Sequence, residues 1–194
     1  METKGFTLAE ILITLSIIGI VAILTIPSVI VSSNQQEYKV GLQKAVDTLN
    51  KAITMNVALE STQPGDMETP GDLLNYFTSR MSISKIKQLE FGPGKNWAFY
   101  TTDGMRFEIA NEGTRIDGVT FKASQCSTPQ PCLIIVDVNG DKKPNPVSTS
   151  DYTVPYQFVL PEQNRVNDLF TIMITDTSAI PFGTVAQKAL YETK

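Results

Sequence analysis

The sequence contains no histidine among its 194 residues, and it has only two cysteines and one tryptophan. Without histidine, the chain has no imidazole for a serine or cysteine catalytic triad, for the commonest kind of zinc site, or for a proton switch near neutral pH. The sequence also lacks a phosphate-binding glycine loop and a group of metal ligands at a recognisable spacing. We therefore expect that the protein is not an enzyme.

A strong net charge is missing as well. The chain has 16 basic and 20 acidic residues, for a formal charge of −4, and this mild acidity argues against a general nucleic-acid binder. Two lysine pairs, Lys85 with Lys87 and Lys142 with Lys143, could contact DNA phosphates, but solvated surface lysines are the interpretation we favour. With 42% hydrophobic and 19% charged residues, the composition excludes collagen-like, disordered and multi-span membrane proteins.

One long segment has no charge at all. From Ile11 to Val31, 15 of 21 residues are Ala, Val, Ile or Leu, and the next charge after Glu10 is Glu37. A helix of this length spans about 31 Å, close to the thickness of the hydrocarbon core of a bilayer. A chain this small could hardly bury such a helix on all sides, so the segment predicts a single membrane-spanning helix. Because Lys4 and the initiator amine precede it, the amino end is expected inside the cell.

A secretory signal peptide is the main alternative for this segment. Such a peptide has a basic leader, a shorter apolar stretch and a small-x-small cleavage site after it. Here the apolar stretch is long and is followed by Ser-Asn-Gln-Gln-Glu-Tyr, without an Ala-x-Ala site. The segment is therefore expected to remain in the mature protein.

The most specific pattern lies just before the apolar segment, where the chain reads Gly-Phe-Thr-Leu-Ala-Glu from Gly5 to Glu10. A carboxylate at the centre of a bilayer costs about 2.5 to 3.5 kcal/mol on insertion scales, and Glu10 has no cation within its own span. Cleavage after Gly5 would give Phe6 a new amine close to Glu10. The amine of a neighbouring subunit could equally become the counter-ion.

These residues resemble the prepilin signature of type IV pilins and type II secretion pseudopilins, which is a glycine, then Phe-Thr-Leu-x-Glu, then a long apolar helix. The resemblance is specific over about residues 4–30. It implies that Gly5 precedes the cleaved bond and that Phe6 becomes the new, N-methylated amino terminus. It also implies that Glu10 is the family's glutamate and that Pro27 is its helix-bending proline, both with roles in assembly.

The resemblance implies a mechanism of processing and assembly. Prepilin peptidase would remove residues 1–5 at the cytoplasmic face of the bacterial inner membrane. An assembly ATPase and an inner-membrane platform protein would then move the subunit from membrane lipid into a filament of identical and related subunits, a pilus or a periplasmic pseudopilus. The head would be extracytoplasmic. The alternative function is a permanently membrane-anchored extracytoplasmic binding domain that does not polymerise.

The expected fold is α+β and pilin-like, with a long amino-terminal helix packed against an antiparallel β-sheet head. We expect a membrane and assembly helix over residues 6–31, its amphipathic continuation over 32–60, and a globular head over 61–194. The continuation is indicated by apolar residues at three- or four-residue spacing. These are Tyr38, Leu42, Ala45, Val46, Leu49, Ile53 and Val57.

Within the head, prolines and glycines predict a loop over Ser61 to Gly71, and Thr69-Pro70 is a typical start for a short helix. That helix would present Leu73, Leu74, Phe77 and Met81 to the core. Apolar runs separated by turn residues predict the strands that follow, and the first two should form a hairpin around Thr-Asp-Gly. The expected strands are Trp97–Thr101, Met105–Ile109, Val119–Ala123, Leu133–Val138, Thr153–Leu160 and Leu169–Thr175.

The two cysteines, Cys126 and Cys132, enclose Ser-Thr-Pro-Gln-Pro. In an exported domain this close spacing favours a local disulfide, and reduced structural thiols are the alternative. The entropic contribution of so short a loop is modest, about 2 kcal/mol. Its expected role is to hold the entrance to the following strand.

Three oxygen side chains, Asp137, Asn139 and Asp141, alternate as they do at the start of a calcium loop. The rest of that motif fails, because Lys142 stands where an EF-hand needs glycine and Ser148 where it needs glutamate. An Asn-Gly turn after an apolar strand is the simpler interpretation. We expect no cofactor, with calcium left open by its occurrence in the heads of some pseudopilins.

Overall fold

A computed structural model describes residues 5, 7–89, 96–110, 112–113, 115–116, 119–140, 142 and 168–191. Contacts along the chain divide it into two compact units, Met1–Glu37 and Tyr38–Lys194. A single α-helix, α1, runs through the boundary between them, from Leu8 to Glu60 over 53 residues. We describe each unit by itself.

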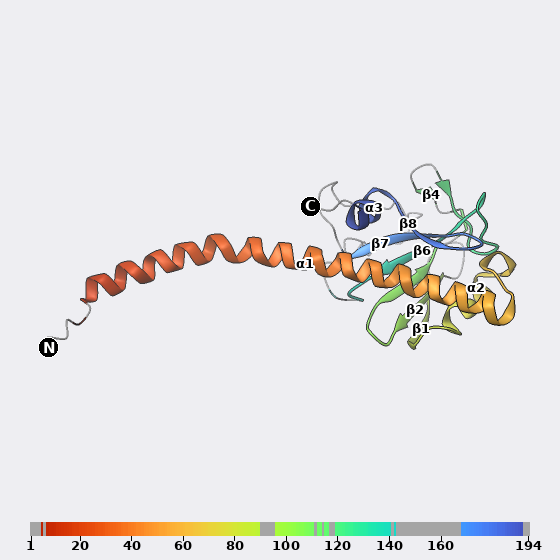
Figure 1. The fold of residues 1–194 in the computed structure, drawn as a ribbon, viewed down its shortest axis with the longest axis horizontal. Helices are drawn as coiled ribbons and strands as arrows, with labels where there is room; N and C mark the ends of the chain where they lie inside the picture. The colour runs from red at the N-terminus through yellow and green to blue at the C-terminus, as the bar shows by residue number, and fades with distance from the viewer. Residues whose placement is uncertain are drawn as a thin grey trace. The chain divides into compact units, whose positions relative to one another are not determined.

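The second unit contains a six-stranded sheet in the order β1-β2-β3-β6-β7-β8, in which every neighbouring pair is antiparallel (Figure 1). A two-stranded ribbon, β4-β5, stands apart from it. The strands are β1 (Ile83–Leu89), β2 (Asn96–Thr101), β3 (Arg106–Ile109), β4 (Arg115–Ile116), β5 (Val119–Thr120), β6 (Cys132–Asp137), β7 (Leu169–Ile174) and β8 (Ala179–Phe182). The helices besides α1 are a 3-10 turn, η1 (Pro64–Asp66), then α2 (Pro70–Thr78) and α3 (Thr184–Tyr191).

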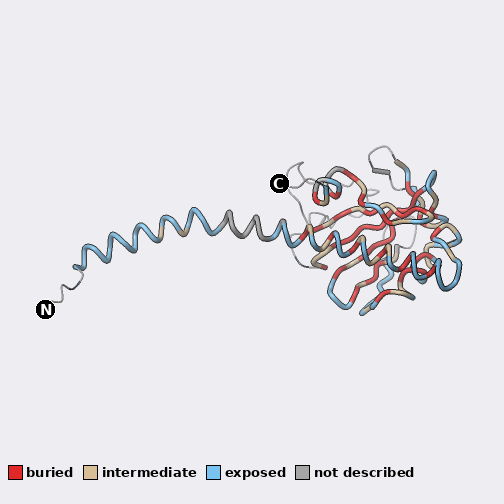
Figure 2. The backbone as a smooth tube through the Cα atoms, in the orientation of Figure 1, coloured by how far each residue is buried: buried red, intermediate tan, exposed pale blue. Residues whose placement is uncertain are grey.

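The main hydrophobic core lies between one face of the sheet and the helices of this unit. Side chains of a strand alternate between its two faces, so Ile134 and Val136 of β6 enter the main core while Leu133 and Ile135 enter a second cluster on the opposite face. All six residues of β6 are buried, as expected for a central strand. Figure 2 shows buried residues concentrated along the strands. From α1, the buried apolar side chains are Tyr38, Leu42, Ala45, Leu49, Ala52 and Ile53.

A glycine sets how closely α1 approaches the end of β6. A Cβ atom placed on Gly41 would lie 2.8 Å from Cβ of Val138, a distance that real side chains do not adopt. The helix backbone therefore contacts Val138 directly, and this contact needs glycine at position 41.

At its free edge, β8 offers no backbone donor to another strand. In an antiparallel strand, the backbone N–H and C=O groups of successive residues face the partner strand and the opposite side in turn. In β8, the backbone groups of Ala179 and Pro181 face away from β7. The N–H of Ala179 donates to Oδ1 of Asn50 at 2.8 Å, and its carbonyl accepts from Nδ2 of Asn50 at 2.9 Å. Pro181 has no N–H. The side chain of a helix residue and one proline thus close this edge.

The α+β class, the long amino-terminal helix and the antiparallel sheet are confirmed. The hairpin around Thr-Asp-Gly is confirmed as β2 and β3, with Gly104 in the left-handed region at φ +92°. Thr69 begins α2 as an N-cap residue, with Asp72 completing a reciprocal capping box, and Met81 is buried although α2 ends three residues earlier. The prediction of Thr153–Leu160 as a strand falls outside the described residues.

Two predictions need correction. The strand expected over Val119–Ala123 is only the two-residue β5, because Lys122 instead makes an isolated parallel bridge with Cys132 and Phe121 turns into the second core cluster. Val57 was expected in the core, but it is 39% exposed near the end of α1, where Asn56 is buried instead. In the buried position Asn56 donates to the carbonyl of Tyr76 and accepts from Arg80, so its polar atoms are satisfied.

Candidate functional site

The start of α1 is fixed by a reciprocal pair of hydrogen bonds between Thr7 and Glu10. The backbone N–H of Glu10 donates to Oγ1 of Thr7 at 3.3 Å, and the N–H of Thr7 donates to Oε2 of Glu10 at 2.7 Å. Oγ1 of Thr7 also donates to the same carboxylate oxygen, at 2.8 Å. This is a capping box, which satisfies backbone donors that a helix would otherwise leave open. Glu10 thus has a local partner before any cation approaches it.

Sequence reasoning missed this role of Thr7. From the sequence, Glu10 was interpreted only as a charge in need of a counter-ion, and Thr7 was not linked to it. The signal was present as Thr-x-x-Glu immediately before an apolar run, which is typical of a helix start. The helix consequently begins at Leu8, after the expected cleavage site.

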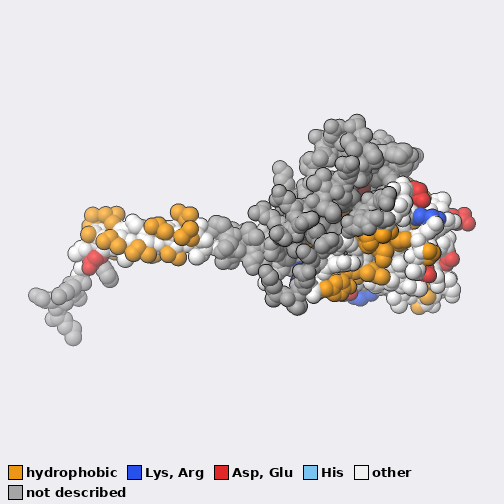
Figure 3. All heavy atoms as spheres, turned by 90° about the horizontal axis from the view of Figure 1, so that it is seen from above, with side chains coloured by type: hydrophobic (Ala, Val, Ile, Leu, Met, Phe, Trp, Pro, Cys, Tyr) orange, Lys and Arg blue, Asp and Glu red, His pale blue; other side chains and the backbone are white. Residues whose placement is uncertain are grey.

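Beyond Glu10, the helix exposes apolar side chains around its circumference. One helix of the described part of the chain, over Leu8–Ile26, is long and apolar enough to cross a membrane, and none of it is buried within the protein. At 19 residues it spans about 28 Å. Figure 3 shows the apolar side chains along this helix. The large exposed ones are Leu8, Ile11, Leu12, Ile13, Leu15, Ile17, Ile18, Ile20, Val21, Ile23, Leu24 and Ile26.

The hydroxyl groups of this segment bond within the helix itself. Thr14 donates to the carbonyl of Ile11 at 2.9 Å, Ser16 to that of Leu12 at 2.8 Å, and Thr25 to that of Val21 at 2.9 Å. Such bonds remove the cost of placing a hydroxyl in lipid, where no water can bind it. The segment therefore presents a surface suited to lipid or to other apolar helices.

The residues expected at the cleavage site are described only in part. Gly5 is exposed, precedes the helix, and has open space where a Cβ would be. Phe6, the expected methylated residue, lies outside the described residues. Pro27 is within α1, which continues through it to Glu60, and nothing is described of its side chain. The helix bending expected at Pro27 stays a prediction.

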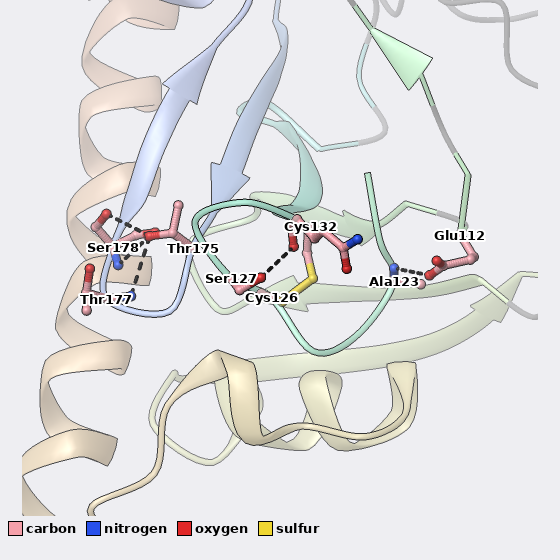
Figure 4. Close-up of a disulfide and its surroundings, with 9 residues drawn as sticks. Glu112, Ala123, Cys126, Ser127, Cys132, Thr175, Thr177 and Ser178 are labelled. Carbon is pink, nitrogen blue, oxygen red and sulfur yellow. Dashed lines mark hydrogen bonds between the residues drawn. A yellow bond between two sulfur atoms is a disulfide. The ribbon is translucent and has the colours of Figure 1, made fainter. Parts of the chain in front are cut away.

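In the second unit, the predicted disulfide between Cys126 and Cys132 is confirmed, with the two Cα atoms 5.0 Å apart (Figure 4). Both cysteines are fully buried and belong to the main core. Cys132 is the first residue of β6, so the bond lies at the entrance to that strand, and the role expected for it there stays a prediction. The described part of the chain contains no free cysteine.

The turn after β6 supports the simpler interpretation of the Asp-x-Asn pattern. The N–H of Asn139 donates to Oδ1 of Asp137 at 3.2 Å, and Gly140 adopts φ +73°. Arg106 lies opposite Asp137 in the register of β3 and β6, and its guanidinium pairs with the carboxylate of Glu108 at 2.7 Å. Asp141 lies outside the described residues, which contain no group of three acidic, histidine or cysteine side chains that could hold a metal ion.

Asp168 joins this turn from a distant part of the sequence. Its carbonyl accepts from the N–H of Val138 at 2.9 Å, which continues the pairing of β6 with β7. Burial raises the pKa of Asp168, although hydrogen bonds from its own backbone and from Asn139 oppose the shift. Sequence reasoning had no means of finding Asp168, because only the pairing of two strands brings it near Asn139.

The lysines considered for DNA binding do not form a described cluster. Lys85 and Lys87 are exposed on the edge strand β1, and the ammonium group of Lys85 lies 5.4 Å from the centre of the Tyr100 ring. Lys142 is exposed after β6, and Lys143 lies outside the described residues. These positions support the interpretation as solvated surface lysines.

Comparison with known proteins gives one match. Residues 2–26 match the family model of the prokaryotic N-terminal methylation motif. No curated protein and no solved structure gave a significant match to the chain. The motif covers the expected cleavage site, the capping box and most of the apolar helix, and it indicates a substrate of prepilin peptidase with an inner-membrane anchor. The chain therefore carries, at residues 2–26, the prepilin-type signal of type IV pilins and pseudopilins.

Proposed function

We propose that this protein is a structural subunit of a type IV pilus-like filament or a type II secretion pseudopilus. Prepilin peptidase cuts between Gly5 and Phe6 and methylates the new amine of Phe6. The mature subunit waits in the inner membrane with its amino end at the cytoplasmic face, and an assembly ATPase with its platform protein adds it to the filament. The observation that carries this proposal is the N-terminal methylation motif on an apolar helix that the rest of the described chain leaves uncovered.

Burial of apolar surface supports polymerisation through this helix. The twelve large apolar side chains between Leu8 and Ile26 are at least 45% exposed, and within a membrane lipid covers them. Outside the membrane, these side chains need another apolar surface of comparable area to replace the lipid. The same helix in neighbouring copies offers such a surface. Gly19 permits close approach, because nothing lies within 4 Å of where its Cβ would be.

The capping box supports the role proposed for Glu10. Its described hydrogen bonds from Thr7 both reach Oε2, and a carboxylate has lone pairs left on its other oxygen. Cleavage would create an amine on Phe6, the residue directly before Thr7. A neighbour's amine could bind the same free oxygen, because a charged partner adds to the capping bonds without displacing them.

A permanently anchored binding domain is the alternative function. It would use the same apolar helix as an anchor but would need neither removal of residues 1–5 nor a charge at Glu10. Among the described residues, the head has an open depression of about 300 Å³, which is at the lower limit for a small-molecule site. The processing motif therefore favours the filament subunit.

Processing is tested by mass spectrometry of the protein extracted from membranes. In cells with active prepilin peptidase, we expect the chain to begin at Phe6 and to carry one extra methyl group on its amine. In matched cells with an inactive peptidase, the chain should begin at Met1. An intact Met1 in both would refute processing and leave the anchored domain as the better account.

Assembly is tested by removing the charge of Glu10. We expect Glu10→Gln and Glu10→Ala to insert into the membrane and to be processed, but to enter filaments about tenfold less than the unchanged chain, because each loses a charge-assisted bond to the amine. The measurement compares subunit in sheared filaments with subunit in membranes. Glu37→Gln, which removes an exposed charge from the same helix, is the matched control. Normal incorporation of Glu10→Gln would refute the counter-ion role.

A further inference from the structure

The short disulfide loop contacts two parts of the head that are distant from it in sequence, and it leads directly into β6. Just before it, the N–H of Gln125 donates to the carbonyl of Met67 at 2.8 Å, and the N–H of Cys126 donates to that of Pro64 at 3.4 Å. Both acceptors belong to the connection between α1 and α2. Within the loop, Oγ1 of Thr128 donates to Oδ1 of Asp176 at 2.9 Å, and Asp176 lies in the turn between β7 and β8. At its end, Cys132 starts β6.

The backbone before the loop is held in an uncommon conformation. Gln125 has φ +53°, in the left-handed region that residues other than glycine rarely adopt. A Cβ on Gly65 would lie 3.1 Å from the carbonyl oxygen of Cys126, so the connection and the loop are in close contact. Such a conformation persists only where its surroundings hold it, and the disulfide is the covalent part of those surroundings.

The two segments that the loop contacts also contribute to the lining of the depression in the head. Gln63, next to Pro64, and Thr177, next to Asp176, line it together with residues of α1. Figure 4 shows the β7–β8 turn between α1 and the disulfide loop. The remaining lining residues are Ile53, Thr54, Val57 and Ala58.

We propose that the Cys126–Cys132 disulfide is a redox latch that fixes this surface of the head only after export. With two thiols, the loop opens and loses its contacts with the α1–α2 connection and the β7–β8 turn, while the six-stranded sheet stays folded. The sheet does not depend on the loop, because β6 is buried on both faces and pairs with β7 along its length and with β3 from Ile134 to Asp137. The latch thus acts on two connections and leaves the six-stranded sheet in place.

Closing the latch is a balanced exchange with an exported disulfide oxidant, such as a thiol–disulfide oxidoreductase. The thiolate of one cysteine attacks the oxidant and forms a mixed disulfide, and the thiolate of the other then displaces the reduced oxidant. Two electrons and two protons pass to the oxidant. Both sulfur-bearing residues end at 0% exposure, so reducing agents reach the closed latch only when the loop opens. Before export the cytosol keeps both thiols reduced.

The test compares hydrogen exchange of the full-length protein in detergent micelles, oxidised and as the Cys126→Ser/Cys132→Ser variant. We expect amides of 63–67, 125–130 and 175–178 to exchange at least tenfold faster in the variant, with β6 and β7 unchanged. Thr128→Val is the matched control. It leaves the disulfide intact, removes the bond to Asp176 and should speed exchange only at 175–178.

Two results would overturn the latch. Unchanged exchange in all three segments would mean that the disulfide holds nothing there, and faster exchange in β6 and β7 would mean that it holds the sheet itself. If the double variant does not fold, the same comparison is made with wild-type protein before and after reduction, and loss of the sheet on reduction again overturns the proposal. None of these outcomes depends on filament formation, so the latch and the proposed function can fail separately.

Discussion

At the scale of single residues, Tyr76 shows how one buried hydroxyl ties the end of α1 to the head. Its ring is 5% exposed and stacks edge-on against Phe77, and its hydroxyl donates to the carbonyl of Thr62 at 3.2 Å. Burial raises the pKa of Tyr76 to about 12; a hydrogen bond with Asn56 opposes this shift, and the charges of Asp66 and Glu60 add to it. The folded protein therefore favours the neutral phenol.

This shift predicts a loss of stability at alkaline pH. An unfolded tyrosine ionises near pH 10, so the contribution of Tyr76 is fully present below pH 10 and is lost as pH rises toward 12. A shift of about two pKa units corresponds to about 3 kcal/mol in full, and because the hydroxyl is only partly buried, solvent screening reduces this to about 1 to 2 kcal/mol. We expect the free energy of unfolding, measured by urea titration in detergent, to fall by up to this amount over that range. The decline should be smaller in Tyr76→Phe, and equal slopes for the two proteins would contradict the prediction.

At the scale of elements, Asn50 joins α1 to the edge strand β8. Its amide donates to the carbonyl of Ala179 and accepts from the N–H of the same residue, as a neighbouring strand would. It also donates to the carbonyl of Val46 within α1 at 3.1 Å. One side chain therefore replaces a strand at the border of the sheet.

Removing this amide should loosen the contact between helix and strand. We expect Asn50→Ala to lower the free energy of unfolding by about 2 kcal/mol, because two backbone groups of Ala179 lose their partner. Asn50→Asp should cost at least as much, since its second oxygen would face the carbonyl of Ala179. Urea titration measures both variants. Asn34→Ala, at an exposed site on the same helix, is the control and should change stability by less than about 0.5 kcal/mol.

The elements differ in how far the sequence alone predicted them. Helix α1 carried a long apolar run and then a three- or four-residue period, α2 carried the start signal Thr69-Pro70, and β2, β3, β6 and β7 carried apolar runs, so all six were expected. The edge strands β1 and β8 were missed, because Lys85 and Lys87 in one and Pro181 in the other interrupt the pattern of a strand. Those interruptions are typical of an edge, where a neighbour on one side is absent.

The residues of the candidate site also differ in whether the sequence could predict them. The pattern from Gly5 to Glu10 predicted the processing signal, since the chemistry of that signal depends on residues adjacent in sequence. The partners of the disulfide loop, Met67 and Asp176, could not be predicted, because they meet it only through the packing of three separate connections.

At the scale of the whole molecule, the two units have different requirements for solvent. The first unit holds the twelve large exposed apolar side chains from Leu8 to Ile26, and the second has its own core. We expect a chain lacking residues 1–27 to be soluble without detergent and to unfold within about 5 °C of the full-length protein, because few core contacts are lost. Gel filtration and a thermal melt measure this. Aggregation of the shortened chain, or a much lower melting temperature, would show that the first unit supports the second.

The blocked outer edge of β8 affects how closely packed copies of the head can interact. Exposed strand edges are the usual route by which folded β proteins join into insoluble sheets. In this head, Asn50 occupies the outward-facing groups of Ala179, Pro181 has no donor to offer, and lysines line the opposite edge at β1. In the filament proposed above, many copies could therefore lie side by side at high local concentration without joining through the edges of their sheets.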